Sequence, residues 1–421
     1  MARAKITSSA MHIDLARARA FWFATQSLDR PSDQSATSLV RATGWLNTAG
    51  GHGPYLALHA RNAAIGREAL ESAVRNGDLV ECPSVRGCSM LVPREDVPLA
   101  LAAGRSFHHQ RFAKLRAKTN VTPREIARLS DAVRAELEPG PIDVEQLRSR
   151  LPAKLHRSLG EAGRALGEAT TLGVAMRALM SSGEVDRVPL HGRLDETQYV
   201  FTLRSIPWDL TPYTQPLALH TLLARRFFAW AAPATRADFA WWAGIKQAEA
   251  VQALEPLALS HVSIESLAGV WLIDGPRRSA VQAAKGTDTV AFVPFRDHAV
   301  ALRRDPRTVI DAKLAEVEVL DWQQRPTTLG ATASVHHHTV LCDGAIIGIW
   351  EYDPIDKGIV WASLGEMSRT RLRIANVIAT GTARFIAQEM GSVRYYAFDH
   401  EPQRALRRRA VCAWRDHAPG S

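Results

Sequence analysis

Residues 42–61 read ATGWLNTAGGHGPYLALHAR. The segment places four glycines and a proline within residues 44–54 and then continues as an apolar run with helical spacing from Tyr55 to Arg61. Glycine and proline at this density prevent residues 47–53 from forming an ordinary helix. The sequence therefore predicts a tight, irregular connection that displays its side chains and lets another backbone or a flat polymer approach closely.

Asn47, Thr48 and His52 are the side chains of this connection that can do polar work. One interpretation is a glycine-rich loop that only joins two helices. The other is a loop that presents a functional site, and the rest of the chain bears on that choice.

The composition is that of an ordinary globular protein with two to four modules: 421 residues, of which 46% are hydrophobic and 23% charged. Lysine and arginine number 52 against 43 aspartate and glutamate, which gives a net charge of +9, and the excess is nearly all arginine. Because arginine suits bidentate phosphate contacts, this balance favours a polyanionic partner.

Cysteine spacing and apolar runs indicate the cellular compartment in which the protein is expected. The four cysteines, at positions 82, 88, 342 and 412, show no CxxC spacing and no clustering with histidine, so we expect reduced thiols, no metal site and no cofactor. The first residues lack the apolar core of a secretory signal, and no apolar run approaches the ~20 residues of a membrane span. We expect a cytoplasmic protein that does not bind membranes, and nothing in the sequence requires more than a monomer.

Helices followed by a strand pair occur three times. In the first case, helices expected at 13–28, 36–46, 55–61 and 67–77 precede strands at 78–85 and 87–93, with a turn at Arg86-Gly87. The second case has a long helix at 161–182 and strands at 184–189 and 198–203. The third has a helix-turn-helix pattern at 234–244 and strands at 262–265 and 270–273. We predict an α+β chain with three tandem winged-helix modules, at 10–118, 119–210 and 211–284.

The pattern changes after residue 285. Strand-like runs occupy 289–294, 334–341, 345–352 and 358–362, and Asp343-Gly344 is a strong hairpin turn between the second and third of them. A helix is expected at 372–390, and residues 403–409 form the densest positive run. Residues 285–421 are therefore predicted to form a C-terminal, β-rich α+β domain with a hairpin.

Several of these segments together resemble a known family. They are LARARA at 15–20, LALHAR at 56–61, MLVPRED at 90–96, WAAPATRADFAWWAG at 230–244 and VLCDGAIIGIW at 340–350. This set is similar to the AlkZ/YcaQ-like winged-helix DNA glycosylases and spans nearly the whole chain. The resemblance implies a monofunctional DNA glycosylase, an N-glycosyl hydrolase that removes bulky N7-alkylguanine adducts from double-stranded DNA. Such an enzyme would serve DNA repair or self-resistance to a genotoxic antibiotic.

The resemblance also implies where the chemistry lies. The family's catalytic motif is a glutamine, an apolar residue and then a glutamine or aspartate, and its places fall on Asn47, Thr48 and Ala49. Asn47 keeps a carboxamide that can orient a water against the sugar, shortened by one methylene, whereas Ala49 offers nothing polar. The candidate catalytic residues are therefore Asn47, with Thr48 and His52 as helpers.

The expected DNA contacts come from three places: Arg61, the strand residues His336, His337 and His338, and Arg407 with Arg408 in the basic tail. His336 and His338 share one face of a strand, so a metal site is an alternative for that pair, although no cysteine or carboxylate accompanies them. Five tryptophans in apolar patterns are expected in the core rather than against bases: Trp45, Trp241, Trp242, Trp271 and Trp350.

Two further functions remain open at this point. A winged-helix protein that lost its chemistry together with the family's glutamines would bind DNA or its damage without cleaving it. A structural protein could instead use tandem winged helices for contacts with other proteins. The leading hypothesis is the glycosylase, because the resemblance covers the catalytic loop as well as the modules.

Overall fold

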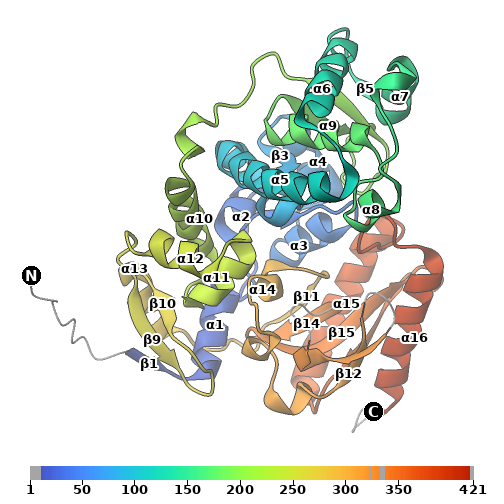
Figure 1. Ribbon diagram of the computed structural model, residues 1–421. Helices are drawn as coiled ribbons and strands as arrows, with labels where there is room; N and C mark the ends of the chain where they lie inside the picture. Colours follow the sequence, from blue (N-terminus) through green and yellow to red (C-terminus); the bar gives the residue numbers. More distant parts are fainter. Residues whose placement is uncertain (1–10, 322–324, 332–336, 418–421) are drawn as a thin grey trace, which may run out of the picture.

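Three helical units, each with a small sheet, precede a larger sheet that lies between two long helices (Figure 1). The computed structural model describes residues 11–321, 325–331 and 337–417. This mixture of helices and antiparallel sheets confirms the α+β fold class expected from the sequence.

The same order of elements occurs three times: a helix, a two-residue strand, two further helices and a hairpin. The first unit has α2 (Ala36–Thr43), β2 (Leu46–Asn47), α3 (Gly53–Arg61), α4 (Arg67–Arg75), β3 (Leu79–Pro83) and β4 (Ser89–Pro93). The second has α6 (Pro123–Leu137), β5 (Ile142–Asp143), α7 (Val144–Arg150), α9 (Thr171–Ser181), β6 (Val185–Pro189) and β7 (Tyr199–Leu203), with α8 (Gly160–Ala165) inserted before α9. The third has α10 (Pro216–Ala231), β8 (Ala234–Thr235), α11 (Arg236–Ala243), α12 (Gln247–Leu254), β9 (Ser260–Ile264) and β10 (Trp271–Ile273).

In each unit the two-residue strand pairs with the second strand of the hairpin. The strand orders are β2-β4-β3, β5-β7-β6 and β8-β10-β9, and β1 (Met11–Ile13) extends the third sheet by pairing in parallel with β9. The start of the predicted 10–118 module therefore lies on the third unit. The long helix α5 (Val97–Thr119) connects the first unit to the second.

Two expected helices are shorter than their sequence patterns indicated. The run 161–182 is not one helix, because α8 ends at Ala165, Gly167 adopts a left-handed φ of 71°, and α9 starts anew at Thr171 with a Thr170 cap. The helix expected at 36–46 ends at Thr43, because Gly44 has a φ of 119° and the chain then enters β2.

The C-terminal sheet has the order β11-β14-β15-β16, formed by β11 (Val290–Val293), β14 (His338–Cys342), β15 (Ala345–Asp353) and β16 (Gly358–Ser363). The expected Asp343-Gly344 turn joins β14 to β15. Helix α15 (Arg369–Glu389) packs its apolar side on one face of the sheet, and α16 (Glu401–His417) packs on the other. The remaining described elements are α1 (Leu15–Thr25), α13 (Gly275–Ala283), α14 (His298–Ala301), β12 (Glu318–Leu320) and β13 (Pro326–Thr328).

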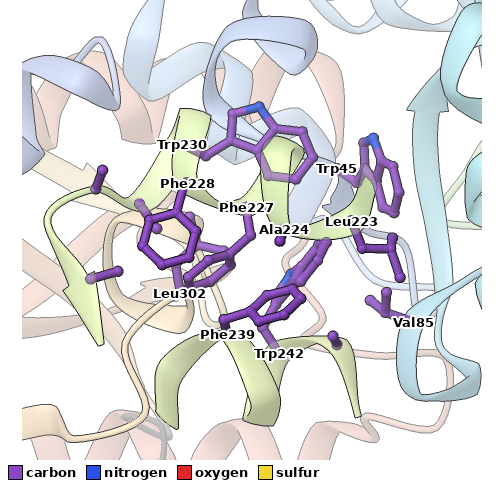
Figure 2. Packing of buried hydrophobic residues seen from close by; sticks show 14 of the residues in the cluster. Trp45, Val85, Leu223, Ala224, Phe227, Phe228, Trp230, Phe239, Trp242 and Leu302 are labelled. Carbon is purple, nitrogen blue, oxygen red and sulfur yellow. The ribbon is translucent and has the colours of Figure 1, made fainter. Parts of the chain in front are cut away.

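The apolar cores cross the boundaries between these parts. The second unit has a core made of its own residues together with the end of α5, and a small cluster lies within the C-terminal domain. One core joins the first unit to the C-terminal sheet and α15, and another joins α1, the first unit and the third unit. Figure 2 shows the centre of this last core, where Trp45 of the first unit meets Trp230 and Trp242 of the third. Their ring centroids lie 5.5 and 5.8 Å from that of Trp45.

Trp45 is 1% exposed, and its indole nitrogen donates to the Asp96 carboxylate at 2.9 Å. Replacing Trp45 with alanine should lower the free energy of unfolding by about 3–5 kcal/mol, because a large buried side chain is lost and the cavity cannot collapse. The measurement is urea denaturation followed by circular dichroism. The half-buried Trp361 on β16 supplies the control, and Trp361→Ala should lower the free energy of unfolding by less than Trp45→Ala does. An equal loss in the two variants would contradict the prediction.

Candidate active site

Asn47 lies on β2 and faces the junction of the first and third units. It pairs with Met90 on β4, and Met90 in turn pairs with Cys82 on β3. Directly opposed residues of an antiparallel sheet share a face, so the Asn47 side chain lies on the side of Met90 and Cys82. The residue is half-buried, and its carboxamide makes no hydrogen bond within the described ranges. Asn47 therefore presents an unused amide beside the core.

Thr48 belongs to the other face of the same sheet. Its hydroxyl donates to the Glu81 carboxylate at 2.6 Å, and the guanidinium of Arg187 from the second unit donates to the same carboxylate oxygen at 2.6 Å. Glu81 pairs with Leu91, one residue out of step with the Asn47 row, which places its carboxylate opposite the Asn47 amide. The Thr48 hydroxyl is buried and committed to Glu81, an arrangement that favours a structural role, and its expected help in catalysis stays a prediction.

His52 is also committed to structure. It is 1% exposed; its Nδ1 accepts from the backbone N–H of Arg394 at 2.9 Å, so Nε2 carries the proton and meets the Asp195 carboxylate at 3.1 Å. Asp195 also accepts two hydrogen bonds from one edge of the Arg193 guanidinium, from Nε and Nη2. Burial raises the pKa of Asp195, but the hydrogen bonds from His52 and Arg193 outweigh it and hold this pKa well below its usual range. Both ring nitrogens of His52 are occupied, which favours a structural role, and the expectation that His52 assists a water stays a prediction.

The glycines between Thr48 and His52 are required by close packing on segment 394–397. A Cβ at Gly51 would lie 2.4 Å from the Tyr395 carbonyl oxygen, and one at Gly50, where φ is 72°, would lie 2.7 Å from the Ala397 Cβ. The Ala397 N–H donates to the Ala49 carbonyl at 3.0 Å. The close approach expected of this loop is thus made by the C-terminal domain of the same chain.

Three arginines expected to bind DNA are engaged inside the protein. Arg61 is 2% exposed and makes a bidentate pair with Asp297 at 2.8 and 2.9 Å. Arg407 is 3% exposed and stacks on Tyr395, and it pairs with two buried carboxylates, those of Glu351 and Asp399. Arg408 has a side chain only 12% exposed, and it pairs with Glu401 at 2.6 Å. The burial of Arg61 and Arg407 against carboxylates disfavours a phosphate contact for these two, whereas Arg408 is half-buried beside the exposed Glu401 and its DNA contact stays a prediction.

The histidines of the C-terminal sheet are likewise internal. His337 and His338 are each 1% exposed, and His338 lies 4.3 Å from the ring of Trp350 and accepts from the Phe295 N–H through Nδ1. Strand β14 lies between β11 and β15 in the sheet, so these two buried histidines are placed as core residues, and their expected DNA contact stays a prediction. His336 lies outside the described residues, so the alternative metal pair of His336 and His338 is not described.

Four of the five tryptophans expected in the core are buried, namely Trp45, Trp242, Trp271 and Trp350. Trp241 differs, because it is half-buried and carries the guanidinium of Arg86 at 4.6 Å from its ring centroid.

Among the described residues, one group of side chains could approach a metal: Asp288, Cys342 and Asp343. Burial raises the pKa of the Cys342 thiol to about 11, which disfavours the thiolate that a metal needs. The Asp343 carboxylate already accepts from the backbone N–H groups of Thr287 and Asp288. The proximity of these three side chains therefore follows from the turn that the Asp343 carboxylate stabilises.

Sequence reasoning missed Glu81 and Asp195, the two carboxylates that fix the loop from either side. Each lies in a strand or wing loop whose sequence is typical of ordinary polar surface. Each contacts a partner that is more than thirty residues away in the sequence. No spacing rule connects such positions. Their only sequence signal is an acidic residue in a run that is otherwise half-apolar.

The repeated units and the loop geometry agree with a family comparison. A model of the AlkZ-like DNA glycosylases matches residues 40–370, most of the chain, and the protein belongs to this DNA glycosylase family. Among solved structures, the Streptomyces sahachiroi DNA glycosylase AlkZ is similar, with a TM-score of 0.69 and 17% sequence identity over 91% of this chain and 100% of that one. At that identity the likeness establishes the shared fold. No curated protein sequence matches the chain.

Within the described ranges, none of the helices is both long enough and apolar enough to cross a membrane.

The contact between His52 and Asp195 should contribute far more to the free energy of unfolding than an exposed pair of the same kind. We expect His52→Ala to lower the free energy of unfolding by about 2–3 kcal/mol, because it leaves a buried carboxylate short of a donor. The exposed pair of His191 and Glu196 provides the control. His191→Ala should lower the free energy of unfolding by less than about 1 kcal/mol. A double-mutant cycle with Asp195→Ala measures the coupling by urea denaturation, and additive effects would disprove a direct interaction.

His298 should make stability fall in mild acid. Its Nδ1 lies 3.2 Å from the Thr43 carbonyl oxygen, and burial lowers its pKa from 6.5 to about 4. The unfolded chain takes up a proton below pH 6.5 that the folded chain refuses until about pH 4, so stability is full above this window and is lost as the pH falls through it. The loss is at most about 3 kcal/mol.

The measurement for His298 is the free energy of unfolding between pH 7 and pH 4. A His298→Asn variant keeps a donor for Thr43 and should show a smaller fall than the wild type. Burial also lowers the pKa of His59 and His108 to about 4, so part of the fall should remain. An exposed-site variant, His400→Asn, should follow the wild-type profile, and an unchanged profile in His298→Asn would contradict the assignment.

Proposed function

We propose that this chain is a monofunctional DNA glycosylase for bulky N7-alkylguanine adducts, and that Asn47 is its catalytic residue. The observation that carries the proposal is the free carboxamide of Asn47 at the family's motif position, on a loop fixed at both ends. Cytoplasmic DNA repair or self-resistance to a genotoxic natural product is the corresponding biological role, with the protein acting as a monomer.

The proposed chemistry needs little beyond a positioned water. An N7-alkylguanine carries a positive charge, so the bond between N9 and C1′ breaks with its electron pair leaving on a neutral base. The Asn47 Oδ1 accepts a hydrogen bond from a water, whose lone pair then bonds to C1′ as the sugar passes through an oxocarbenium-like transition state. The released proton goes to solvent, and the products are the free base and an abasic site.

The three repeated units would supply the DNA-binding frame. Each has the element order of a winged helix, and we propose that they act as tandem winged helices within boundaries near those expected from the sequence, apart from β1. The net charge of +9 supports a polyanionic partner.

A second function has one observation in its favour. Ala49 occupies the place of the family's second polar residue, and Thr48 and His52 are committed elsewhere, so Asn47 acts without a helper. A protein that binds damaged DNA without excising the base is therefore the alternative.

The deciding experiment uses a duplex with one bulky N7-alkylguanine, purified protein in excess and alkaline cleavage of abasic sites. Asn47→Ala should lower the single-turnover rate by about a hundredfold or more, because the water loses its orientation, with the dissociation constant for the duplex changing less than about twofold. The exposed Asn76→Ala is the matched amide control and should keep full activity.

Three outcomes would redirect the proposal. A fully active Asn47→Ala protein would move the chemistry to another residue. No product from wild-type protein that still binds tightly would favour the binding-only function. Faster excision of N7-methylguanine than of the bulky adduct would contradict the substrate class.

A further inference from the structure

Two arginines next to Asn47 lack the carboxylate partner that Arg61, Arg187 and Arg407 have. Arg86 lies in the turn between β3 and β4, and Arg296 follows β11. Both side chains are exposed, and neither makes a hydrogen bond or ion pair with any residue in the described ranges. Both are therefore available to an anion.

Arg86 is held in place by the third unit. Its backbone has a φ of 57°, and a Cβ on Gly244 would lie 2.9 Å from the Arg86 Cγ, so the stem of Arg86 packs on the end of α11. Its guanidinium lies over the Trp241 ring, a stacking that leaves the N–H edges free for an anion.

Arg296 is held by the residues on either side of it. Its backbone has a φ of 61°, and its guanidinium lies 5.0 Å from the ring of Phe295, which stacks on Tyr395 at 4.7 Å. On the other side, the Asp297 carboxylate is fixed by the buried pair with Arg61. The segment around Arg296 is thus anchored, and Arg296 is exposed between the buried Phe295 and Asp297.

Both arginines border the strand that carries Asn47. The turn that contains Arg86 leads into Ser89, whose carbonyl accepts the Thr48 N–H at 3.2 Å. Arg296 lies between two anchor points of the Asn47 loop, because His298 contacts Thr43 and segment 394–397 contacts residues 49–52. An anion bound between the two guanidinium groups would therefore lie beside Asn47.

Partial loss of water lowers the pKa of the Arg296 guanidinium although the side chain is exposed, and the nearby charge of Arg86 lowers it further. Cys88 and Tyr396 act in the opposite direction and raise this pKa. A bound anion would relieve both costs.

We propose that Arg86 and Arg296 clamp a backbone phosphate of the damaged strand and thereby set the position of the target nucleoside over Asn47. This inference rests on the proposed function, since it takes DNA as the ligand. The two arginines are positioning residues: they hold the strand, and Asn47 handles the water. A phosphate next to the target sugar is the ligand that paired guanidinium groups match best.

The test compares the double variant Arg86→Gln/Arg296→Gln with a control of equal charge change, Arg124→Gln/Arg128→Gln. The control residues are exposed on α6, which lies well away from α3 in Figure 1. Binding of an unmodified duplex and of the adduct duplex is followed by fluorescence anisotropy from 50 to 300 mM KCl. The clamp variant should bind at least about tenfold more weakly. Its slope of log affinity against log salt should fall by about one.

Excision gives a second readout, which separates holding of the strand from the chemical step. The clamp variant should need at least about tenfold more protein to reach half of its maximal single-turnover rate, with that maximal rate falling less than about tenfold. Asn47→Ala should show the reverse. Arg86→Lys/Arg296→Lys, which keeps both charges, should recover part of the affinity and serves in place of the glutamine variant if that one fails to fold by circular dichroism.

The outcomes separate the two proposals. If the clamp variant loses no more affinity or salt dependence than the control, the clamp is overturned, while excision by the wild type leaves the proposed function standing. If the wild type excises nothing, the proposed function falls. The salt-dependent binding of unmodified duplex still decides whether Arg86 and Arg296 hold a phosphate.

Discussion

The burial of Trp45 between Trp230 and Trp242 is the interaction on which the arrangement of the site depends. It joins the first unit to the third and fixes the chain two residues before Asn47. Five residues after Asn47, His52 is fixed between the Arg394 backbone and the Asp195 carboxylate. A loop held at both ends by elements from three other parts of the chain loses little further entropy when it engages a ligand. Such a loop can keep one amide at a fixed place without a general base.

The positive charge of this protein has two separate uses. Many arginines form internal links between parts of the chain: Arg61 with Asp297, Arg187 with Glu81, and Arg407 with Glu351 and Asp399. Breaking one of these buried pairs would leave an uncompensated charge, so they specify how the parts dock. The arginines without carboxylates, such as Arg86 and Arg296, are the ones that we propose attract DNA. In the densest basic run of the sequence, Arg407 is buried against carboxylates, whereas Arg409 is exposed.

The chemistry proposed for Asn47 follows from the leaving group. A cationic purine adduct needs little help from an acid, so a site that only orients water can be sufficient. Asn47 lies on the Met90 side of the sheet with a carboxamide that makes no hydrogen bond within the described ranges, whereas Thr48 donates to the buried Glu81 carboxylate on the other side. Alternation along a two-residue strand thus divides neighbouring polar residues into one for chemistry and one for structure.

The sequence by itself determined the α+β class, the order of helices and hairpins, the turn at Asp343-Gly344 and the irregular loop after Leu46, because these follow from local periodicity and from glycine and proline. It also placed Asn47 in that loop, through the resemblance of the surrounding segments. It did not determine which polar residues stay free. His52, Arg61, His338 and Arg407 have the chemistry of DNA contacts, and only the tertiary structure buried them against partners tens to hundreds of residues away. A side chain's availability depends on its neighbours in space, and those neighbours are set by docking between parts of the chain whose contacts leave no periodic trace in the sequence.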